Sequence, residues 1–434
     1  MVLAAVLPGV SRADEPAASR AGRPNIVFVL VDDLGVEGLG CYGGTSYKTP
    51  HLDRLASEGM RFTHAYSNPI CSPTRVALMT GQYNYRNYDG WGVFDPAKNV
   101  TFGHLLRDAG YATNLAGKWQ FDNFQDHPDQ IRDSGFSDYM AWTWFLDGRN
   151  TSRYWNPSLW SDGKLVPDTD GQYGPDLVNQ FQLDFIREHK DGPFLLYYPL
   201  ILVHSPFQAP PGDDGEAGGG GGSRPRRNFP AMVEYMDKMV GNLVAALDEA
   251  GVRDNTLIVF TGDNGTPRGI VSTMNGREVP GGKATMKQTG SHVAMIANWP
   301  GVIAPGSTCD DLVDVTDHFA TLADLAGVAV PDALPIDGHS YAPQLRGGEG
   351  SPRSWGLVEL WDQRFAFTQT HKLDQNGDLF DITDSPFSEP LVAPGEDTAE
   401  SKAARELLGD ALAAMPKAVK RPGDGPRSSE RDER

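Results

Sequence analysis

Cysteine is scarce in this sequence. Only Cys41, Cys71 and Cys309 occur among 434 residues. Three cysteines cannot form the disulfide framework that holds many small secreted domains together. Cys41 and Cys309 could pair, but their separation in sequence says nothing about the geometry that a disulfide needs. We therefore expect free thiols and a fold that depends on its hydrophobic core.

Positive charge is also in short supply. The chain has 38 Lys and Arg against 57 Asp and Glu, which gives a formal net charge of -19. This composition argues against nucleic acid as a partner, because no basic stripe compensates for the acidic excess. A protein of this composition that acts on an anion must gather its positive side chains at one site.

Long apolar runs are missing as well. No stretch after the N-terminus approaches the ~20 apolar residues that a membrane span needs, so we expect no span. The segment Met1 to Ala13 is apolar and ends in small residues, like the end of a secretory signal, although it lacks a basic start. The alternative is a disordered tail. We predict a truncated signal peptide and a periplasmic or secreted protein.

Length and composition fit a globular α/β protein with one large domain and a smaller one. Hydrophobic residues make up 39% of the chain, and a stretch rich in turn residues at 331–350 suggests a boundary. The predicted division is a signal remnant or disordered N-terminus at 1–23, a main α/β domain at 24–348, a small C-terminal α+β subdomain at 349–398, and a terminal helix with a disordered tail at 399–434.

Buried strands and amphipathic helices alternate along the chain. The strands are expected at 25–31, 111–117, 193–203 and 255–261, and short antiparallel runs at 354–384. The helices are expected at 49–59, 101–110, 229–251, 313–327 and 399–414. This alternation predicts an α/β fold with a large mixed, mostly parallel sheet between helices and a smaller C-terminal antiparallel sheet.

Two segments lack this periodicity. Between about Asp122 and Gly174 the pattern weakens, and aromatic residues gather there. They could stack on sugar rings, but we expect them to pack the segment down. Pro210 to Arg227 is rich in glycine and is expected to be a flexible surface loop. The aromatic residues between Asp122 and Gly174 are Trp142, Trp144, Tyr154, Trp155 and Trp160.

Acidic and amide side chains follow two of the predicted strands. Asp32 and Asp33 come directly after the first strand, and Asp263 and Asn264 follow the strand at 255–261. Open α/β sheets bind ligands at the carboxyl ends of their strands. Hard oxygen donors suit Ca²⁺ or Mg²⁺ and disfavour Zn²⁺. The alternatives are a solvated turn at Asp32 and Asp33 and a hairpin turn at Asp263 and Asn264.

The two adjacent aspartates need a bend in the chain if they are to share a ligand. Neighbouring residues of a strand point to opposite faces, so Asp32 and Asp33 diverge in an extended chain. Gly35 and Gly38 follow closely and permit a change of direction. These glycines therefore permit the bend that a shared ligand needs.

The segment around Cys71 predicts a helix with a nucleophile at its start. Pro73 and Thr74 suit a helix beginning and Gly81 suits its end, so Cys71 lies at or beside the N-cap. Free backbone N–H groups and the helix dipole favour an anion there, and Arg75 adds a fixed charge. The arrangement suits attack on an anionic ester. The alternative is a buried cysteine before a surface helix.

Short segments along the chain, in order, resemble the type I, formylglycine-dependent sulfatases of the alkaline phosphatase-like superfamily. Cys71-Ser-Pro-Thr-Arg75 matches the signature Cys-x-Pro-x-Arg, whose cysteine is oxidised to formylglycine during synthesis. The resemblance extends over most of residues 25–391. The other matching segments are Val31-Asp-Asp-Leu-Gly35, Thr49-Pro-His-Leu-Asp-Arg-Leu55, Gly117-Lys-Trp119, His204-Ser-Pro206, Thr261-Gly-Asp-Asn-Gly265, Gly282-Lys283 and Trp299-Pro-Gly301.

The resemblance implies an arylsulfatase-like sulfuric ester hydrolase that acts on sulfated carbohydrates or on small aryl or alkyl sulfates. It implies maturation by a formylglycine-generating enzyme, which converts Cys71 to 3-oxoalanine. By similarity, Ca²⁺, or Mg²⁺ in its place, is bound by Asp32, Asp33, Asp263, Asn264 and the modified Cys71. The residues implied to contact the modified side chain or the sulfate are Arg75, Lys118, His204 and Lys283.

Three positions depart from the family pattern. Gln120 stands where many sulfatases have a histidine, and an amide cannot take up a proton. The step that regenerates the aldehyde must then depend on another base. Gln288 and His292 stand where relatives often have Glu and Arg, which changes the local charge network.

Two other functions are compatible with the same motifs. One is a phosphodiesterase or phosphonate monoester hydrolase, because such relatives share the Cys-x-Pro-x-Arg signature. The other is a non-catalytic sulfated-glycan binding protein in which Cys71 stays unmodified. Comparing turnover of an aryl sulfate with that of aryl phosphate diesters distinguishes a sulfatase from a phosphodiesterase or phosphonate monoester hydrolase. Retained ligand binding without turnover, together with an intact thiol at position 71, would indicate the binding protein.

Overall fold

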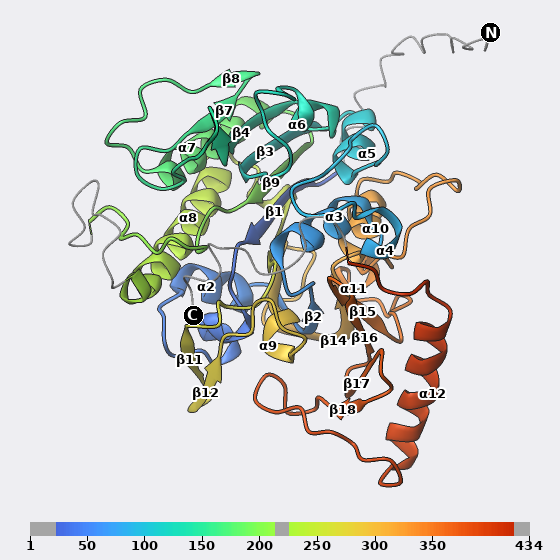
Figure 1. Cartoon of the computed structure of the whole chain (residues 1–434). Coiled ribbons are helices and arrows are strands. Elements are labelled where there is room, and N and C mark those ends of the chain that lie inside the picture. The colour runs from blue at the N-terminus through green and yellow to red at the C-terminus, as the bar shows by residue number, and fades with distance from the viewer. Residues whose placement is uncertain (1–22, 213–224, 421–434) are drawn as a thin grey trace.

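A ten-stranded mixed sheet forms the centre of the molecule (Figure 1). The computed structural model describes residues 23–212 and 225–420. β1 pairs in parallel with β10 on one side and with β9 on the other, and β3 and β4 continue the parallel set. The strands, in their order across the sheet, are β14 (Ser307–Asp314), β2 (Met60–Tyr66), β13 (His292–Asn298), β10 (Thr256–Gly262), β1 (Asn25–Val31), β9 (Phe194–Pro199), β3 (Ala112–Lys118), β4 (Asp138–Trp142), β7 (Leu159–Ser161) and β8 (Lys164–Leu165).

Helices cover both faces of this sheet (Figure 1). One face carries α2 (Pro50–Ser57), α7 (Gly174–His189) and α8 (Phe229–Glu249). The other carries α3 (Cys71–Thr80), α5 (Phe102–Asp108) and α10 (Asp317–Leu325). The short helices are α4 (Asn84–Asn87), α6 (Gln130–Asp133), α9 (Gln288–Ser291) and α11 (Ala342–Leu345), with 3-10 turns at Val36–Gly38, Gly40–Tyr42, Pro225–Asn228 and Arg253–Asn255. The predicted layered fold is confirmed.

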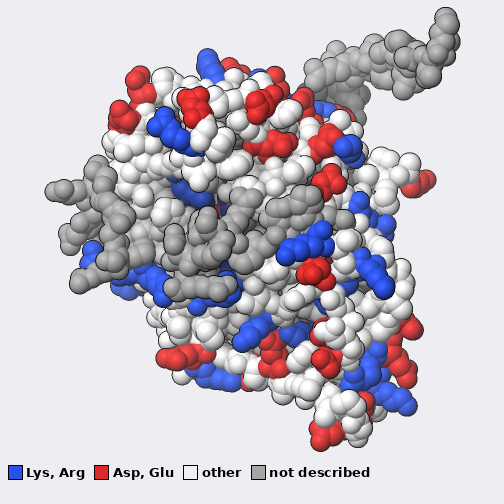
Figure 2. All heavy atoms as spheres, viewed as in Figure 1, with Lys and Arg blue, Asp and Glu red and all other residues white. Residues whose placement is uncertain are grey.

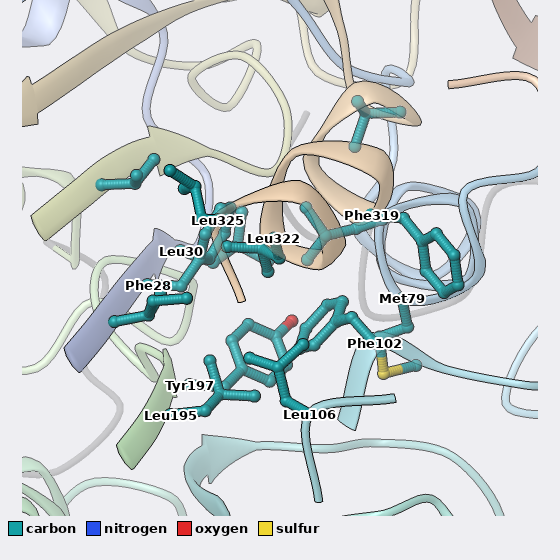
Figure 3. Packing of buried hydrophobic residues seen from close by; sticks show 14 of the residues in the cluster. Phe28, Leu30, Met79, Phe102, Leu106, Leu195, Tyr197, Phe319, Leu322 and Leu325 are labelled. Carbon is teal, nitrogen blue, oxygen red and sulfur yellow. The ribbon is translucent and has the colours of Figure 1, made fainter. Parts of the chain in front are cut away.

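The side chains of β1 alternate between two cores. Phe28 and Leu30 pack on the side of α10, as Figure 3 shows, while Val27 and Val29 pack on the side of α8. A strand that is covered on both faces needs apolar residues at every position, which explains the continuous run at 25–31. The ring of Tyr197 on β9 packs edge-on against Phe28, with centroids 6.0 Å apart. The site described below rests on this buried strand.

A four-stranded antiparallel sheet follows the main sheet in sequence, as predicted (Figure 1). Helix α12 (Ala399–Ala413) packs against it through Leu408, which is fully buried beside Leu373 and Leu379. Arg353 forms a buried salt bridge with Asp317 at the start of α10, which ties this part to the main sheet. The strands are β15 (Gly356–Leu360), β16 (Gln363–Phe367), β17 (His371–Asp374) and β18 (Leu379–Asp381). The domain limits given above remain predictions.

One predicted helix is wrong at its start. The sequence suggested a helix over 313–327, but Val313 and Asp314 end strand β14, and α10 begins only at Asp317. The apolar residues Leu312 and Val313 fit either assignment, and pairing with β2 decides in favour of the strand. The strand expected at 193–203 is also shorter, because β9 ends at Pro199, although Leu200, Leu202 and Val203 still form backbone hydrogen bonds with Leu30 and Asp32.

The aromatic segment belongs to the sheet rather than to a loop. β4 and β7 extend the main sheet, and two short strands, β5 (Phe145–Leu146) and β6 (Arg149–Asn150), form a hairpin between them. Trp142 and Tyr154 are buried, which agrees with the expectation of packing. The strands are only two to five residues long, too short for a clear alternating pattern.

Several predictions lie wholly or partly outside the described residues. They concern the signal remnant at the N-terminus, the glycine-rich part of the 210–227 loop and the C-terminal tail after residue 420. Within the described ranges, no helix has the length and apolar character needed to cross a membrane. The three cysteines are free thiols, as expected.

Candidate active site

Parallel pairing brings the two acidic strand ends together. In the register of β1 and β10, Val31 lies opposite Gly262, so the residues that follow both strands emerge at one edge of the sheet. The backbone N–H of Asp33 donates to Asp263 Oδ1 at 3.1 Å, and Asn264 Nδ2 donates to Asp33 Oδ1 at 2.8 Å. All of these side chains are fully buried. The predicted convergence of the two segments therefore occurs.

The bend that the adjacent aspartates need lies at Asp33 itself. Asp33 has φ 68°, in the left-handed region, whereas Gly35 has an ordinary φ of -79°. The chain therefore bends at the aspartates, as a shared ligand requires, and the residue in the left-handed region is Asp33 rather than Gly35. Aspartate tolerates this conformation better than most side chains, and its carboxylate is held here by Asn264. The turn directs Asp32 and Asp33 into one cluster.

Cys71 is the first residue of α3, with Ile70 as the N-cap. Its Sγ lies 3.2 Å from Lys118 Nζ. Ligand atoms of Asp32, Cys71 and Asp263 all lie within 4.8 Å of one another, and all three residues are buried. Burial raises the pKa of the Cys71 thiol. In its unmodified form, residue 71 is therefore a protonated thiol near pH 7.

Each buried carboxylate of the site faces one cation. Lys118 Nζ lies 2.6 Å from Asp32 and Lys283 Nζ lies 2.8 Å from Asp33. Arg75 binds Asp263 through two of its nitrogens, at 2.7 and 3.1 Å. The three positive and three negative side chains cancel, so the site has no excess positive charge of its own for an anionic substrate.

The carboxylates differ strongly in pKa. Burial raises the pKa of Asp33 and Asp263, and for Asp263 the charge of Asp32 adds to that effect. For Asp32, burial also favours the neutral form, but the charges of its cationic neighbours, above all Lys118, outweigh it and hold the pKa far below its usual value. Raised carboxyl pKa values inside a cluster indicate a lack of positive charge, which a bound cation would supply.

His204 carries its proton on Nδ1. That atom lies 2.6 Å from the Ser205 carbonyl oxygen, which can only accept. Nε2 is therefore the acceptor and lies 3.1 Å from Lys283 Nζ. Burial and the charge of Lys283 hold the pKa of His204 well below its ordinary value. His204 is therefore neutral at pH 7, with Nε2 directed at Lys283.

Oxygen atoms without a partner suit a hard divalent cation at this position. Asp32 Oδ1 and Asn264 Oδ1 are both buried and accept no hydrogen bond from the described residues. A buried acceptor without a donor is costly, and a cation would satisfy both atoms. The donor set of carboxylate and amide oxygens is the one that Ca²⁺ and Mg²⁺ prefer. The residues present therefore fit such an ion.

The three departures from the family pattern lie in different surroundings. Gln120 has φ 56° and is partly exposed, and its side chain makes no hydrogen bond to the site among the described residues. Gln288 is buried, and its amide atoms have no partner within that same part of the chain. His292 lies between Ser385 Oγ and the Thr63 carbonyl oxygen, where it connects the main sheet to the C-terminal part.

Tyr154 and Arg153 were missed as site residues in the sequence. Tyr154 was noted only as one of several aromatics, yet its hydroxyl donates to the His204 carbonyl oxygen and so fixes that segment. Arg153 is buried and stacks on Trp142, with its guanidinium carbon 3.9 Å from the ring centroid. No periodicity or motif distinguishes these two residues in the sequence, because their position depends on the fold of the segment around them.

The sheet topology and the cluster at its edge define an enzyme of the alkaline phosphatase-like superfamily. The chain belongs to the sulfatase family, because the family model described as Sulfatase matches residues 24–328. It is therefore a sulfuric ester hydrolase, as the resemblance implied.

Individual relatives agree with this assignment. The chain is 30% identical to steryl-sulfatase from Rattus norvegicus over 76% of this chain and 72% of the relative. It is 31% identical to N-acetylgalactosamine-6-sulfatase from Canis lupus familiaris over 81% and 70% of the two chains. A solved sulfatase structure from Bacteroides thetaiotaomicron, described with the metabolism of multiple glycosaminoglycans, matches with a TM-score of 0.73 at 21% identity, covering 91% of this chain and 100% of that one. The last likeness shows the fold alone.

Proposed function

We propose that this protein hydrolyses sulfate monoesters with a formylglycine made from Cys71 and with a bound divalent cation. The observation that carries the proposal is the position of Cys71 at the start of α3, with Sγ 3.2 Å from Lys118 Nζ and within 4.8 Å of oxygens of Asp32 and Asp263. A nucleophile in this place meets positive charge, helix N–H groups and hard oxygen ligands at once.

The cation is Ca²⁺, or Mg²⁺ in its place. Asp32, Asp33, Asp263 and Asn264 would hold it, together with the modified residue 71, and the unpartnered oxygens of Asp32 and Asn264 support this assignment. When bound, the ion supplies positive charge for the sulfate oxygens and lowers the pKa of the nucleophile. This charge is what the balanced set of three cations and three carboxylates lacks.

Once Cys71 is converted to formylglycine, its hydrated side chain would supply the hydroxyl nucleophile for attack on sulfur. Arg75 holds Asp263 in place and adds positive charge on α3, four residues after Cys71. Lys118 lies beside residue 71 and positions Asp32. When the sulfur–oxygen bond of the ester breaks, the departing alcohol takes a proton from Lys283, whose Nζ lies 3.1 Å from the acceptor atom Nε2 of His204.

Sulfated carbohydrates and small aryl or alkyl sulfates are the proposed substrates. The relatives named above act on a steryl sulfate and on an N-acetylgalactosamine 6-sulfate by their names, which supports this range. Maturation by a formylglycine-generating enzyme and a periplasmic or secreted location are part of the same proposal. Figure 2 shows acidic and basic side chains mixed over the face in view.

The proposal is tested on protein that is co-expressed with a formylglycine-generating enzyme. Mass spectrometry of the tryptic peptide 62–75 should find the aldehyde at residue 71. The same preparation should hydrolyse 4-nitrophenyl sulfate much faster than bis(4-nitrophenyl) phosphate. Cys71→Ala should remove the activity and retain the circular dichroism spectrum. A thiol at residue 71 in a protein that binds sulfated glycans, or a preference for the phosphate diester, would contradict the proposal.

A further inference from the structure

Arg153 is a buried cation that has no anionic partner within residues 23–212 and 225–420. Its residue surface is 9% exposed, and its Nη1 is fully buried and has no hydrogen-bond partner in those ranges. Among the described residues no carboxylate forms a salt bridge with it, whereas Arg75, Lys118 and Lys283 each have one. An unpaired buried charge is costly, so such a residue is retained in a site mainly when a ligand completes it.

Two contacts place Arg153 beside the candidate active site. Its guanidinium lies over Trp142 at the end of β4, and Trp142 is the register neighbour of Lys118 on β3. The next residue, Tyr154, donates its hydroxyl to the carbonyl oxygen of His204. The segment of Arg153 therefore borders the site on the side of Lys118 and His204.

The stacking on Trp142 gives Arg153 a fixed orientation. A guanidinium held over an aromatic face keeps its edge N–H groups available for a planar oxyanion. The indole N–H of Trp142 donates to Thr151 Oγ1 at 2.9 Å, which fixes the ring below it. Arginine in such a setting suits bidentate binding of a carboxylate or a sulfate better than a flexible lysine does.

We propose that Arg153 binds a second anionic group, a carboxylate or a further sulfate, on the alcohol part of the substrate. This inference rests on the proposed sulfatase function and adds a substrate class to it, namely sulfate esters of alcohols that are themselves anionic. The sulfate group that is hydrolysed binds to the cluster around Cys71, whose cations already have carboxylate partners. Arg153 is in this view a specificity residue.

The test measures binding and not turnover, so that its failure is distinct from failure of the chemistry. The full chain with Cys71→Ser, loaded with Ca²⁺, is titrated calorimetrically with two matched pairs of sugars. The first pair is a monosulfated glucuronic acid and its primary amide. The second is glucosamine 2-N,6-O-disulfate and N-acetylglucosamine 6-O-sulfate. Within each pair only the second anionic group differs.

The expected result is that the doubly anionic member of at least one pair binds about 10- to 100-fold more tightly than its neutral partner. Arg153→Met should remove this preference and leave the affinity for the neutral partner within about threefold. Arg153→Lys should restore only part of it, because the ammonium lacks the planar fork. The pair that responds identifies the anion as carboxylate or sulfate. Arg149→Met, at an exposed arginine of the neighbouring hairpin, should change nothing.

Three results would overturn the inference. An equal loss of affinity for all four sugars would place Arg153 on the shared sulfate. Unchanged binding in Arg153→Met would leave only the stacking role on Trp142. Failure of all four sugars to bind the Ca²⁺-loaded protein at millimolar concentration would also contradict it. Circular dichroism of both Arg153 variants identifies a loss of fold, and Arg153→Lys keeps the charge if the Met variant does not fold.

Discussion

Single residues of the site are held in charge pairs that leave little freedom. Lys118 is fully buried, contacts Asp32 at 2.6 Å and lies 3.2 Å from Cys71 Sγ. Asp32 in turn keeps a low pKa because its cationic neighbours outweigh the effect of burial. The ionised form of Asp32 therefore depends on its partner cations. A change at one member of a pair is expected to affect both the fold and the chemistry.

Lys118→Met tests this dependence. The substitution leaves the Asp32 carboxylate buried with less compensation, and we expect a loss of about 3–5 kcal/mol in the free energy of unfolding. We also expect the activity of the folded variant to fall about 10²- to 10³-fold, because a positive charge beside the nucleophile is lost. Urea denaturation and initial rates on an aryl sulfate measure the two effects. Lys98→Met, at an exposed lysine beside Asp95, should leave the unfolding midpoint unchanged.

Helix α3 places the nucleophile and depends on how it ends. Gly81, its C-cap, has φ 68°, and its backbone N–H donates to Ala77. A Cβ at this position would lie 2.8 Å from Cβ of Phe319 on α10. The sequence predicted the glycine stop, but not the close approach of α10, which only the packing of the two helices creates.

Gly81→Ala should therefore cost more stability than the same change at a glycine with open space. Gly251 has φ 71° after α8, and nothing lies within 4 Å of its Cβ position. Gly251→Ala should lose about 1 kcal/mol from backbone strain alone, and Gly81→Ala should lose about 1–3 kcal/mol more from the displaced Phe319. Thermal unfolding of both variants measures the difference. Equal losses would show that the collision is relieved without cost.

Strand β13 begins at His292, which connects two parts of the fold. Its ring stacks on Tyr66, with centroids 4.9 Å apart, and bonds Ser385 and Thr63. Burial lowers the pKa of His292 to about 4. At this position the histidine is neutral, so it does not replace the charge of the arginine that relatives often have there.

The pH dependence of stability follows from that pKa. Above pH 6.5 neither the folded nor the unfolded histidine is protonated, so the shift has no effect there. As the pH falls from 6.5 to 4, the unfolded chain takes up the proton and the folded chain does not, so up to about 3 kcal/mol of stability is lost. Urea unfolding between pH 7 and 4 should show a smaller acid loss in His292→Gln. An equal loss of unfolding free energy per pH unit in the wild type and in His292→Gln would contradict the low pKa of His292.

At the scale of the whole molecule, the site joins segments that lie far apart in the chain. Asp32 follows β1, Asp263 follows β10, and Lys283 comes from the segment after the β11 (Val271–Met274) and β12 (Arg277–Pro280) hairpin. A ligand that binds these groups only in the folded state stabilises the entire sheet edge. Metal binding is therefore expected to be visible in global unfolding.

Ca²⁺ added to chelator-treated protein should raise the melting temperature. At a hundredfold excess over Kd the gain is about 2.7 kcal/mol, since the ion binds only the folded state. Asn264→Ala removes one proposed ligand and should weaken the response, whereas Asn376→Ala, in the exposed turn between β17 and β18, should not. Differential scanning calorimetry with Ca²⁺ and with Mg²⁺ measures the shift in melting temperature of the wild type and of the two variants. No shift with either ion would contradict the metal site.

Local sequence patterns are enough to predict the layers of the fold and the segments that build the site. The apolar run at 25–31, the helix at Cys71 and the strand before Asp263 follow from local side-chain periodicity and capping, which need no information about distant residues. The ordered motifs then indicated the family, which the match over 24–328 confirms.

Which side chains come into contact depends on the folded chain. The turn at Asp33, the start of α10 after β14 and the position of Arg153 over Trp142 all depend on pairing and packing between segments that are distant or lack a regular pattern. Local propensities at these positions are weak, and burial against neighbouring elements determines the conformation. The charge pairing of Asp32, Asp33 and Asp263 with Lys118, Lys283 and Arg75 follows the same rule, because electrostatic energies depend on distances that only the folded chain fixes.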